Sequence, residues 1–350
     1  MSKIRIAVAG AGLIGQAHIQ VLAKSPSCKL SAIVDPSPAA VAIAAKEGVP
    51  LYQSIDELLL MNRPDGLVLA TPNQWHVSQA LQCMEVKLPI LLEKPIATTV
   101  AEGEKIVAMV AATDAKVLIG HHRAHSPIMA KAKEVIAAGK LGTLVALMGS
   151  ATFFKPDHYF TDAPWRKELG GGPILINMIH EVHNLRMLCG DIVAVQAFGS
   201  HATRGFAVED TVAINLRFAN GALGTFMLSD TSASARSWEQ TAQENKSYAS
   251  YDDEDCYVIS GTHGTLSVPT MRLKSYPRFE DRSWWKAFDS NVVSMVRDDP
   301  LKLQIEHFGA VIRNEAMPLV SAYDGLQNLR VTEAIFESTK TGQIVVLHAH

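Results

Sequence analysis

The first 120 residues alternate between short apolar runs and segments with helical spacing of apolar residues. A short β-rich run at 4–9 ends in glycines. Continuous apolar runs of strand length at 66–70 and 88–92 are typical of strands buried on both faces of a sheet. The same pattern predicts further strands at 29–34 and 116–120 and helices at 14–24, 39–47, 55–62 and 102–112. Strands and helices that alternate in this way predict an α/β domain with a parallel sheet.

The pattern changes after residue 121 to a two-residue alternation of apolar and polar positions. Such an alternation runs from Val212 to Phe218, and Asn220-Gly221 separates it from a second apolar run, which is a strong hairpin signal. A second hairpin is predicted at 258–268. Helices at 127–138, 301–313 and 322–339, a loop at 229–255 and a strand at 343–347 complete the pattern. We therefore predict two domains, 1–121 and 122–350, the second an α+β domain with a mainly antiparallel sheet.

Composition excludes several classes of protein. The chain has 350 residues, 48% of them hydrophobic, which is enough for about two domain cores at roughly 150 residues each. Its 32 basic and 35 acidic residues leave no positive excess for nucleic acid. No apolar run approaches the ~20 residues of a membrane span, and glycines interrupt the only apolar stretch that resembles a signal peptide. Four scattered cysteines without a C-x-x-C pair indicate a cytoplasmic protein.

A glycine motif, Gly10-Ala11-Gly12-Leu13-Ile14-Gly15, follows the first predicted strand and opens the first helix. In such a turn the first glycine permits the tight bend, the second lets the backbone approach a pyrophosphate, and the third allows close packing of helix and strand. Asp35 follows 20 residues after Gly15, at the end of the second strand, where a carboxylate binds the ribose hydroxyls and repels a 2′-phosphate. We therefore predict a Rossmann domain that binds NAD, with NADP less favoured.

Two further polar turns follow predicted strands of this sheet. Thr71-Pro72-Asn73-Gln74-Trp75-His76 follows the strand at 66–70, and Glu93-Lys94-Pro95 follows the strand at 88–92. Ligands of such folds bind at the carboxyl ends of the strands. Lys94 at this edge suits acid–base work or stabilisation of an alkoxide, although a lysine taken alone is more often an ordinary surface residue.

With these motifs the sequence resembles the Gfo/Idh/MocA family, named after glucose–fructose oxidoreductase, inositol dehydrogenase and a rhizopine-catabolism protein. The resemblance also covers Trp165-Arg166 and the stretch from Gly170 to His180, so it spans essentially the whole chain. It implies an open C-terminal sheet that often mediates dimers or tetramers. It also implies oxidation or reduction of a secondary alcohol/ketone pair on sugars, inositols or related polyols with NAD(P).

Roles carried over from the family give the candidate site. The resemblance implies Lys94 and His180 as catalytic residues, with Lys94 next to a peptide bond to Pro95 that is often cis. The residues expected at the dinucleotide are Gly10, Gly12, Leu13, Ile14, Gly15, Asp35, Thr71, Pro72, Asn73, His76, Glu93, Lys94, Trp165 and Arg166. The residues expected at the substrate are Lys94, His122, Arg123, Tyr159, Trp165, Asn177, His180 and His183.

One position departs from the family pattern. Many members carry Asp four residues before the histidine, where this chain has Ile176, with Asn177 beside it. The family acid three residues after the histidine is His183 here. The usual proton relay is therefore incomplete, and either Lys94 or His180 serves as the base.

Other interpretations of the same residues stay open. His180 and His183 lie on one helical face and, with His121, His122 or His125, would suit a metal, but we expect none because nicotinamide chemistry needs no metal. His183 is equally well a core histidine. His122 and Arg123 either contact a ligand or form a polar joint between domains. The polar-aromatic loop with Lys155, Asp157, Tyr159, Trp165 and Arg166 suits either hydroxyl recognition or a subunit interface.

The expected function is an NAD-dependent dehydrogenase that acts on a secondary hydroxyl of a polyol, sugar or similar ring, in a homodimer or homotetramer. Two alternatives remain. One is a dehydrogenase of a cis-dihydrodiol of an aromatic acid, with Arg123 or Arg166 binding the carboxylate. The other is a non-catalytic regulator that senses the dinucleotide, which would need neither Lys94 nor His180.

Overall fold

The computed structural model describes residues 2–347, and the chain divides into two compact units. The first comprises Met1–His125 with Asp299–Leu329, and the second comprises Ser126–Asp298 with Arg330–His350. The first boundary between the units, after His125, lies close to the domain boundary that the sequence predicts after residue 121. The segment Asp299–Leu329 differs from the prediction, because the sequence pattern assigns it to the second domain.

The first unit is built on a six-stranded parallel sheet with the strand order β3-β2-β1-β4-β5-β6. The order reverses between β1 and β4, which is where ligands bind in doubly wound folds. β4, β5 and β6 are buried along their whole length, as their continuous apolar runs predict. The strands are β1 (Ile4–Ala9), β2 (Cys28–Val34), β3 (Leu51–Tyr52), β4 (Gly66–Leu69), β5 (Ile90–Glu93) and β6 (Val117–Gly120).

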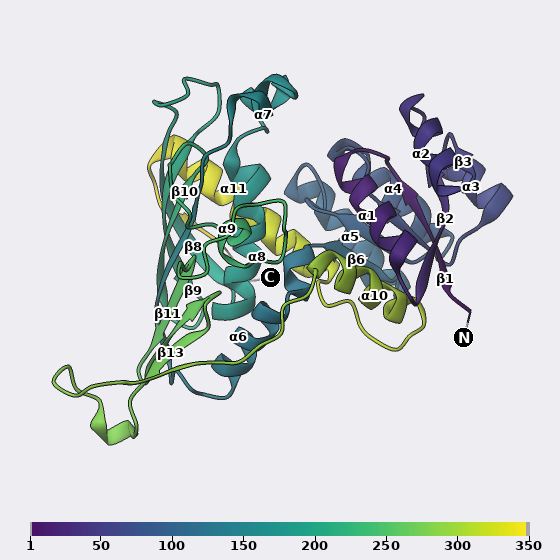
Figure 1. Ribbon diagram of the computed structural model, residues 1–350. Helices are drawn as coiled ribbons and strands as arrows, with labels where there is room; N and C mark the ends of the chain where they lie inside the picture. The colour runs from purple at the N-terminus through teal and green to yellow at the C-terminus, as the bar shows by residue number, and fades with distance from the viewer. Residues whose placement is uncertain (1, 348–350) are drawn as a thin grey trace. The chain divides into compact units, whose positions relative to one another are not determined.

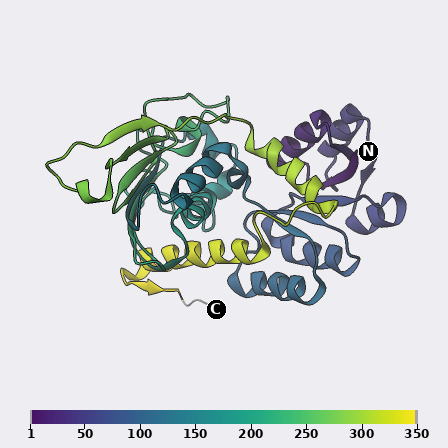
Figure 2. The ribbon, with the colours of Figure 1, turned by 90° about the horizontal axis from the view of Figure 1, so that it is seen from below.

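Helices cover both faces of this sheet (Figure 2). Ser54 caps α3 by accepting from the Glu57 amide, and Thr99 caps α5 by accepting from the Glu102 amide, so two helix starts are set by local sequence. The helices are α1 (Leu13–Lys24), α2 (Ala39–Glu47), α3 (Ile55–Asn62), α4 (His76–Glu85) and α5 (Val100–Thr113), with short 3₁₀ turns η1 (Asn73–Trp75) and η2 (His122–His125). The predicted Rossmann-type fold is confirmed.

Helix α10 (Pro300–Ile312) explains why the late segment belongs to the first unit. It packs against α1 and η2, and in Figure 2 it is the yellow-green helix beside the purple helices. Phe308 and Ile312 lie against Gly66 of β4, where a Cβ atom would stand 2.6 Å from Ile312 Cδ1 and 3.0 Å from Phe308 Cζ. Helical spacing shows which face of α10 is apolar, but not which sheet buries that face.

The second unit is built on a nine-stranded sheet with the order β14-β13-β12-β11-β7-β10-β9-β8-β15. All of its pairs are antiparallel except β7 with β10, so the predicted mainly antiparallel sheet and both hairpins, β9–β10 and β11–β12, are confirmed. The strands are β7 (Leu144–Thr152), β8 (Ile192–Ser200), β9 (Thr211–Phe218), β10 (Leu223–Ser229), β11 (Tyr257–Gly261), β12 (Gly264–Val268), β13 (Arg272–Ser275), β14 (Asp289–Val292) and β15 (Val345–Val346).

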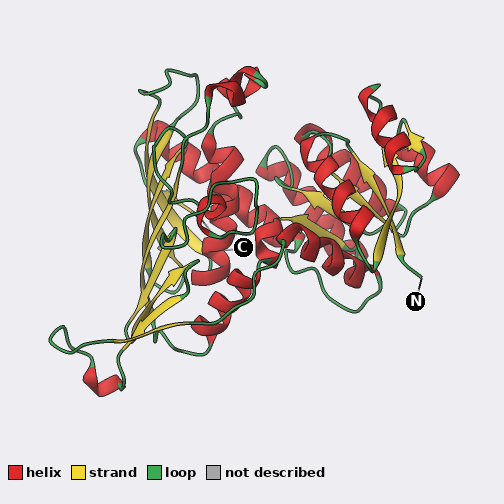
Figure 3. Ribbon diagram, in the orientation of Figure 1, coloured by secondary structure: helices red, strands yellow, loops and turns green. Residues whose placement is uncertain are grey.

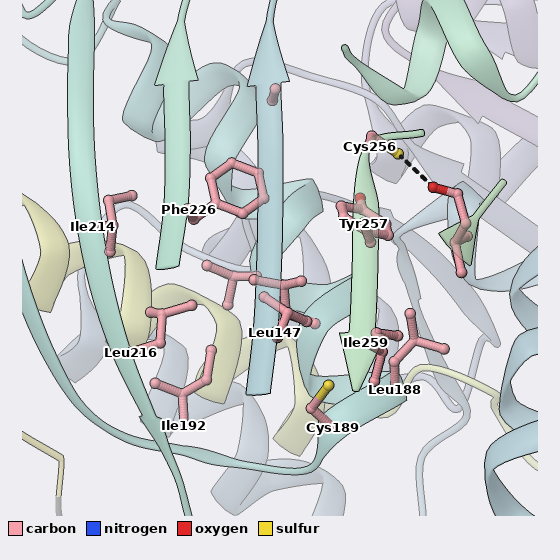
Figure 4. Packing of buried hydrophobic residues seen from close by; sticks show 14 of the residues in the cluster. Leu147, Leu188, Cys189, Ile192, Ile214, Leu216, Phe226, Cys256, Tyr257 and Ile259 are labelled. Atoms are coloured by element: carbon pink, nitrogen blue, oxygen red, sulfur yellow. Dashed lines mark hydrogen bonds between the residues drawn. The ribbon is translucent and has the colours of Figure 1, made fainter. Parts of the chain in front are cut away.

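Helices cover one face of this sheet, as the red helices beside the yellow strands show in Figure 3. α6 (Pro127–Ala137) and α8 (Ile179–Cys189) lie on that face (Figure 1). Leu147, Ile214, Phe226 and Ile259 of four strands form the core there together with Leu188 of α8 (Figure 4). The other helices of the unit are α7 (Asp157–Thr161), η3 (Pro164–Lys167), η4 (Ile174–Met178), α9 (Trp238–Thr241), η5 (Phe279–Asp281) and part of α11 (Ala322–Thr341).

The opposite face of the sheet carries large apolar side chains in contact with solvent. Met148 is 60% exposed, Phe198 65% and Leu223 57%. The predicted loop at 229–255 contains the short helix α9. Within residues 2–347, no helix has both the length and the apolar character that a membrane crossing requires.

Candidate functional site

The glycine turn joins β1 to α1 at the point where the strand order reverses. Gly10 has a φ of +91°, and a Cβ atom there would stand 2.4 Å from the Ala70 carbonyl oxygen. A Cβ atom at Gly15 would stand 1.9 Å from the Gly10 carbonyl oxygen. Both positions therefore accept only glycine. A Cβ atom at Gly12 would meet nothing within 4 Å, so this glycine leaves space beside the backbone rather than relieving a clash.

The N-terminus of α1 suits an anionic group. Gly12 is the N-cap residue and offers no side-chain cap, and the first turn holds no acidic residue. Leu13 is 86% exposed and Ile14 36%. The first-turn amides of a helix have no intrahelical acceptor, and the helix dipole gives this end a partial positive charge. A cradle of this kind fits the pyrophosphate of a dinucleotide.

Asp35 follows β2 and is fixed by two backbone amides. Its Oδ2 accepts from Ala11 N at 2.7 Å, and its Oδ1 accepts from Ser37 N at 2.8 Å. Burial alone would raise the pKa of Asp35, but these hydrogen bonds outweigh burial and lower it below its ordinary value. The carboxylate is therefore ionised at neutral pH beside the glycine turn, which favours ribose hydroxyls and disfavours a 2′-phosphate.

The turn after β4 is tied to the segment that follows β5. His76 is 1% exposed, with Nδ1 2.7 Å from the Pro95 carbonyl oxygen and Nε2 2.9 Å from the Thr71 carbonyl oxygen. Burial lowers the pKa of His76, while the two carbonyl contacts act in the opposite direction. The ring bridges two turns inside the protein, whereas the sequence predicted a contact with the dinucleotide. Pro72 and Asn73 lie in the same turn, and both are exposed.

Glu93, at the end of β5, is buried against α1. Its Oε1 lies 2.7 Å from His18 Nε2, and a Cβ atom at Gly120 would stand 2.8 Å from the Glu93 carboxyl group. Burial alone would raise the pKa of Glu93, but the His18 hydrogen bond and the charges of His18, His122 and Lys94 lower it. These contacts of Glu93 therefore help to fix the end of β5, which Lys94 follows directly.

Lys94 is partly exposed at this strand end, and the peptide bond between Lys94 and Pro95 is cis. His122 and Arg123 follow β6, the neighbouring strand. His122 is partly exposed, whereas Arg123 is 3% exposed and so is not a solvated residue.

In the second unit, the polar-aromatic loop gathers three predicted residues. The Arg166 guanidinium donates through Nη1 to the Tyr159 carbonyl oxygen at 2.6 Å. Its Cζ lies 3.7 Å from the centroid of the Tyr159 ring and 5.6 Å from that of Trp165. These are cation–π distances. Tyr159, Trp165 and Arg166 thus form one cluster.

Asn177, His180 and His183 lie on consecutive helical turns, but the first turn is wider than the sequence predicts. Asn177 belongs to the π-helical turn η4, and both histidines belong to α8. His180 is 9% exposed and His183 6%. A π-turn adds a residue to the turn and shifts the phase of the side chains, and such turns are frequent at functional sites. Asn177 accepts from Lys155 Nζ at 2.8 Å through Oδ1.

Several residues near these positions were not predicted as site residues. His18 supports Glu93, Lys155 contacts Asn177, and Glu209 accepts from the Ile174 amide at the start of η4. Lys155 was visible only as one member of the polar-aromatic loop. His18 and Glu209 lie 75 and 35 residues from their partners, and no local pattern marks them. Within residues 2–347, His, Cys, Asp and Glu side chains form no group of three or more that would hold a metal ion.

Comparison with known proteins identifies the family. A model of the oxidoreductase family GFO/IDH/MocA, NAD-binding Rossmann fold, matches residues 4–121, and a model of the GFO/IDH/MocA C-terminal domain matches residues 129–267. This chain belongs to the Gfo/Idh/MocA family of oxidoreductases. Its N-terminal Rossmann domain is thus of the NAD-binding type, and the expected family, fold and cofactor are confirmed.

Curated relatives of this Gfo/Idh/MocA protein include dehydrogenases. It is 24% identical to inositol 2-dehydrogenase of Rubrobacter xylanophilus, over 97% of this chain and 92% of that protein. It is 26% identical to the NAD⁺-dependent scyllo-inositol 2-dehydrogenase of Bacillus subtilis, over 99% and 96%. It is 29% identical to the rhizopine catabolism protein MocA of Rhizobium meliloti, where the match spans 54% of this chain and 58% of that protein.

Solved structures share the fold. An oxidoreductase from Agrobacterium radiobacter, in complex with NAD⁺, L-tartaric acid and magnesium, gives a TM-score of 0.80 at 18% identity, over 99% of this chain and 98% of that chain. The WlbA dehydrogenase from Bordetella pertussis, in complex with NADH and UDP-GlcNAcA, gives 0.78 at 23% identity over 100% of both chains. At these identities the likeness establishes the fold alone.

Proposed function

We propose that this oxidoreductase is an NAD-dependent dehydrogenase that interconverts a secondary alcohol and a ketone on a polyol, sugar or similar ring. The observation that carries the proposal is the ionised Asp35 carboxylate, which Ala11 N holds at 2.7 Å beside the glycine turn. Asp35 follows β2 of the same sheet whose β5 strand is followed by Lys94. The substrate class rests on the relatives named as inositol dehydrogenases.

The dinucleotide would be held by residues of the first unit. The amides after Gly12 would bind the pyrophosphate, and Asp35 would accept from the ribose hydroxyls. When bound, NAD supplies the carbon centre that accepts the hydride. The further contacts that we propose come from Gly10, Leu13, Ile14, Gly15, Thr71, Pro72, Asn73, Glu93 and Lys94, and from Trp165 and Arg166 of the second unit.

Proton transfer is the task of Lys94 and His180. In oxidation one of them takes the hydroxyl proton, and an ammonium at Lys94 stabilises the alkoxide as charge develops on oxygen. His180 is held in α8 at 9% exposure, which limits its contact with solvent. We propose that His122, Arg123, Tyr159, Trp165, Asn177 and His183 contact the substrate hydroxyls.

A panel of inositols, sugars and other polyols tests this function. Each compound is incubated with NAD and, in parallel, with NADP, and reduction of the nicotinamide is followed by absorbance. We expect turnover of at least one cyclic polyol or sugar, with NAD preferred. Tight NAD binding without turnover of any compound would instead indicate a dinucleotide-sensing regulator.

A carboxylate-bearing substrate, such as an acidic sugar or a cis-dihydrodiol of an aromatic acid, is a second candidate. Among residues 2–347, the buried Nε of Arg166 has no hydrogen-bond partner, and a guanidinium edge binds carboxylates well. Comparison of an acid substrate with its methyl ester tests this candidate. Equal kcat/KM for acid and ester would exclude it.

The assembly state and location complete the proposal. The exposed apolar face of the nine-stranded sheet, with Met148 at 60% and Phe198 at 65% exposure, is typical of a protein–protein interface. We propose a cytoplasmic homodimer or homotetramer that acts on small molecules. Light scattering coupled to gel filtration measures the assembly, and a monomer at micromolar concentration would contradict it.

A further inference from the structure

Lys155 follows β7 in the second unit and places its charged end inside the protein. The residue is 8% exposed. Its Nζ lies 2.8 Å from Asn177 Oδ1 and 3.5 Å from Asp230 Oδ2. Because burial of an ammonium group is costly without partners, both contacts help to keep the Lys155 amine at Asn177.

Arg204 holds the backbone of the same lysine. Its Nη2 donates to the Lys155 carbonyl oxygen at 2.8 Å, and its Nε donates to Asp230 Oδ1 at 2.9 Å. Asp230 is 2% exposed, and its two carboxyl oxygens are divided between Arg204 and Lys155. Both the backbone and the amine of Lys155 are therefore held, which restricts the position of Nζ.

This position determines which way the Asn177 amide faces. An ammonium group only donates hydrogen bonds, so Asn177 must turn its oxygen toward Lys155. The nitrogen, Nδ2, must then point away from Lys155. In the part of the chain that the structure describes, the Asn177 amide makes its only hydrogen bond to Lys155, and Asn177 is partly exposed. Its two N–H groups are thus presented as donors in a fixed direction.

Asn177 precedes His180 by three residues, and the π-turn η4 leads directly into α8. The same helical segment therefore carries the amide donor and the candidate catalytic imidazole. A ligand oxygen beside His180 is the kind of acceptor that an oriented amide would hold.

We propose that Lys155 is a positioning residue that sets the direction of the Asn177 amide, so that Asn177 donates a hydrogen bond to a substrate oxygen; this rests on the dehydrogenase function proposed above. Lys155 itself exchanges no proton with the substrate. Its role is to select one of the two orientations of a side chain that contacts the substrate.

The protonation state of Lys155 gives this role a pH dependence. Burial lowers the pKa of Lys155 to about 8, Asp230 and Glu239 oppose that shift, and Arg166 adds to it. Glu209 also interacts with Lys155 electrostatically. Above this pKa the amine is neutral and donates a weaker hydrogen bond. The amide orientation is then less well held, and the KM for the substrate should rise as the pH increases through about 8.

Steady-state kinetics of Lys155→Met and Lys155→Arg test the proposal, with Lys131→Met as the matched control on an exposed ion pair with Glu134. Loss of a charge-assisted hydrogen bond predicts an increase of about tenfold in the substrate KM of Lys155→Met, with the KM for NAD changed by less than about twofold. Lys155→Arg should recover most of the affinity and lose the rise in KM near pH 8, because a guanidinium does not titrate there.

A double mutant separates positioning from a general structural role. If Lys155 acts through Asn177, Lys155→Met should add little to the KM of Asn177→Leu. Independent, multiplicative effects of the two substitutions would overturn the proposal. A rise in KM near pH 8 that persists in Lys155→Arg would also overturn it.

A measurement without substrate distinguishes failure of this inference from failure of the proposed function. In protein labelled with ¹⁵N-asparagine, the Asn177 side-chain amide signal, assigned by its loss in Asn177→Leu, should shift with a midpoint near pH 8. The shift should be absent in Lys155→Met. A pH-independent signal in the wild type would refute the Lys155–Asn177 coupling even if the enzyme is active. A signal that titrates in a protein without dehydrogenase activity would support the coupling and refute the proposed function.

Discussion

His18 Nε2 lies 2.7 Å from Glu93 Oε1, and both side chains are buried. A carboxylate only accepts hydrogen bonds, so Nε2 must carry the proton. The pair joins α1, which opens at the glycine turn, to the strand end that precedes Lys94. One hydrogen bond thus connects the proposed dinucleotide site with the proposed catalytic lysine.

Glu93→Ala should destabilise the first unit substantially. The substitution leaves the buried His18 ring without its acceptor, and breaking a buried pair typically costs about 3 kcal/mol or more in the free energy of unfolding. Urea denaturation measures the loss. Glu85→Ala, an exposed site on α4, is the control and should stay within about 0.5 kcal/mol of wild type.

The His18–Glu93 pair also predicts that the free energy of unfolding depends on pH. The pKa of Glu93 is lower in the folded protein than its ordinary value of 4.5, so the unfolded chain binds the proton more readily. The contribution of the pair is complete above pH 4.5 and is lost as the pH falls through the lowered pKa. Glu93→Gln should therefore lose less stability than wild type on acidification, and equal losses would argue against an ionised Glu93.

Asp35→Ala should weaken the preference for NAD over NADP. The variant removes the acceptor for the ribose hydroxyls and the charge that repels a 2′-phosphate. We expect the KM for NAD to rise about tenfold, the effect of losing hydrogen bonds to a charged group, and the KM for NADP to fall. Asp56→Ala, at the start of α3, should change neither value, and an unchanged cofactor preference in Asp35→Ala would contradict the assignment.

Substitutions at Gly12 and Gly15 should separate an effect on NAD affinity from an effect on stability. In Gly12→Ala the new Cβ atom meets nothing within 4 Å, so the protein should unfold like wild type but bind NAD at least about tenfold more weakly, because the methyl group occupies the space proposed for the pyrophosphate. Gly15→Ala places a Cβ atom 1.9 Å from the Gly10 carbonyl oxygen and should reduce stability as well. Calorimetric titration and thermal unfolding measure the two effects; normal NAD affinity in Gly12→Ala would place the dinucleotide elsewhere.

Lys94→Ala and His180→Ala should each reduce kcat by roughly 10²-fold or more, the usual contribution of a positioned acid or base. NAD affinity, measured by calorimetry, should fall far less than kcat, because Lys94→Ala removes only one of the proposed dinucleotide contacts and those to the pyrophosphate and ribose remain. Near-normal turnover of a proven substrate by Lys94→Ala would show that the role given to this lysine is wrong.

His76→Phe should loosen the connection between the turns after β4 and β5. The Thr71 and Pro95 carbonyl groups lose their contacts at 2.9 and 2.7 Å, which should cost about 1–3 kcal/mol. Because burial lowers the pKa of His76 below its ordinary value of 6.5, protonation favours the unfolded chain, and wild type should lose stability as the pH falls below 6.5. Thermal unfolding between pH 5 and 8 should show a smaller loss in His76→Phe; identical pH profiles would contradict the bridge.

Local features of this protein were predictable from the sequence. Gly10, Gly15 and Asp35 lie in one strand–turn–helix–strand unit, where backbone sterics and short connections leave few alternatives. The Asn220-Gly221 hairpin was equally local. Both outcomes depend on residues near one another in the chain, so a single sequence contains the necessary signal.

Contacts between distant segments were not predictable in the same way. The apolar face of α10 was evident, but its packing on α1 and against Gly66 was not. The partners of Glu93 and Asn177 lie 75 and 22 residues away, and η4 changes the phase of the helix before His180. Tertiary packing selects among many arrangements that have equal local preference.

The sequence by itself therefore determined the glycine turn, the place of Asp35 at the end of the second strand and the two sheet types, because steric limits and side-chain periodicity act over a few residues. Only the tertiary structure decided that His18 supports Glu93, that His76 bridges two turns and that Lys155 orients Asn177. Those relationships depend on where separate elements meet, because each joins residues that lie far apart in the chain.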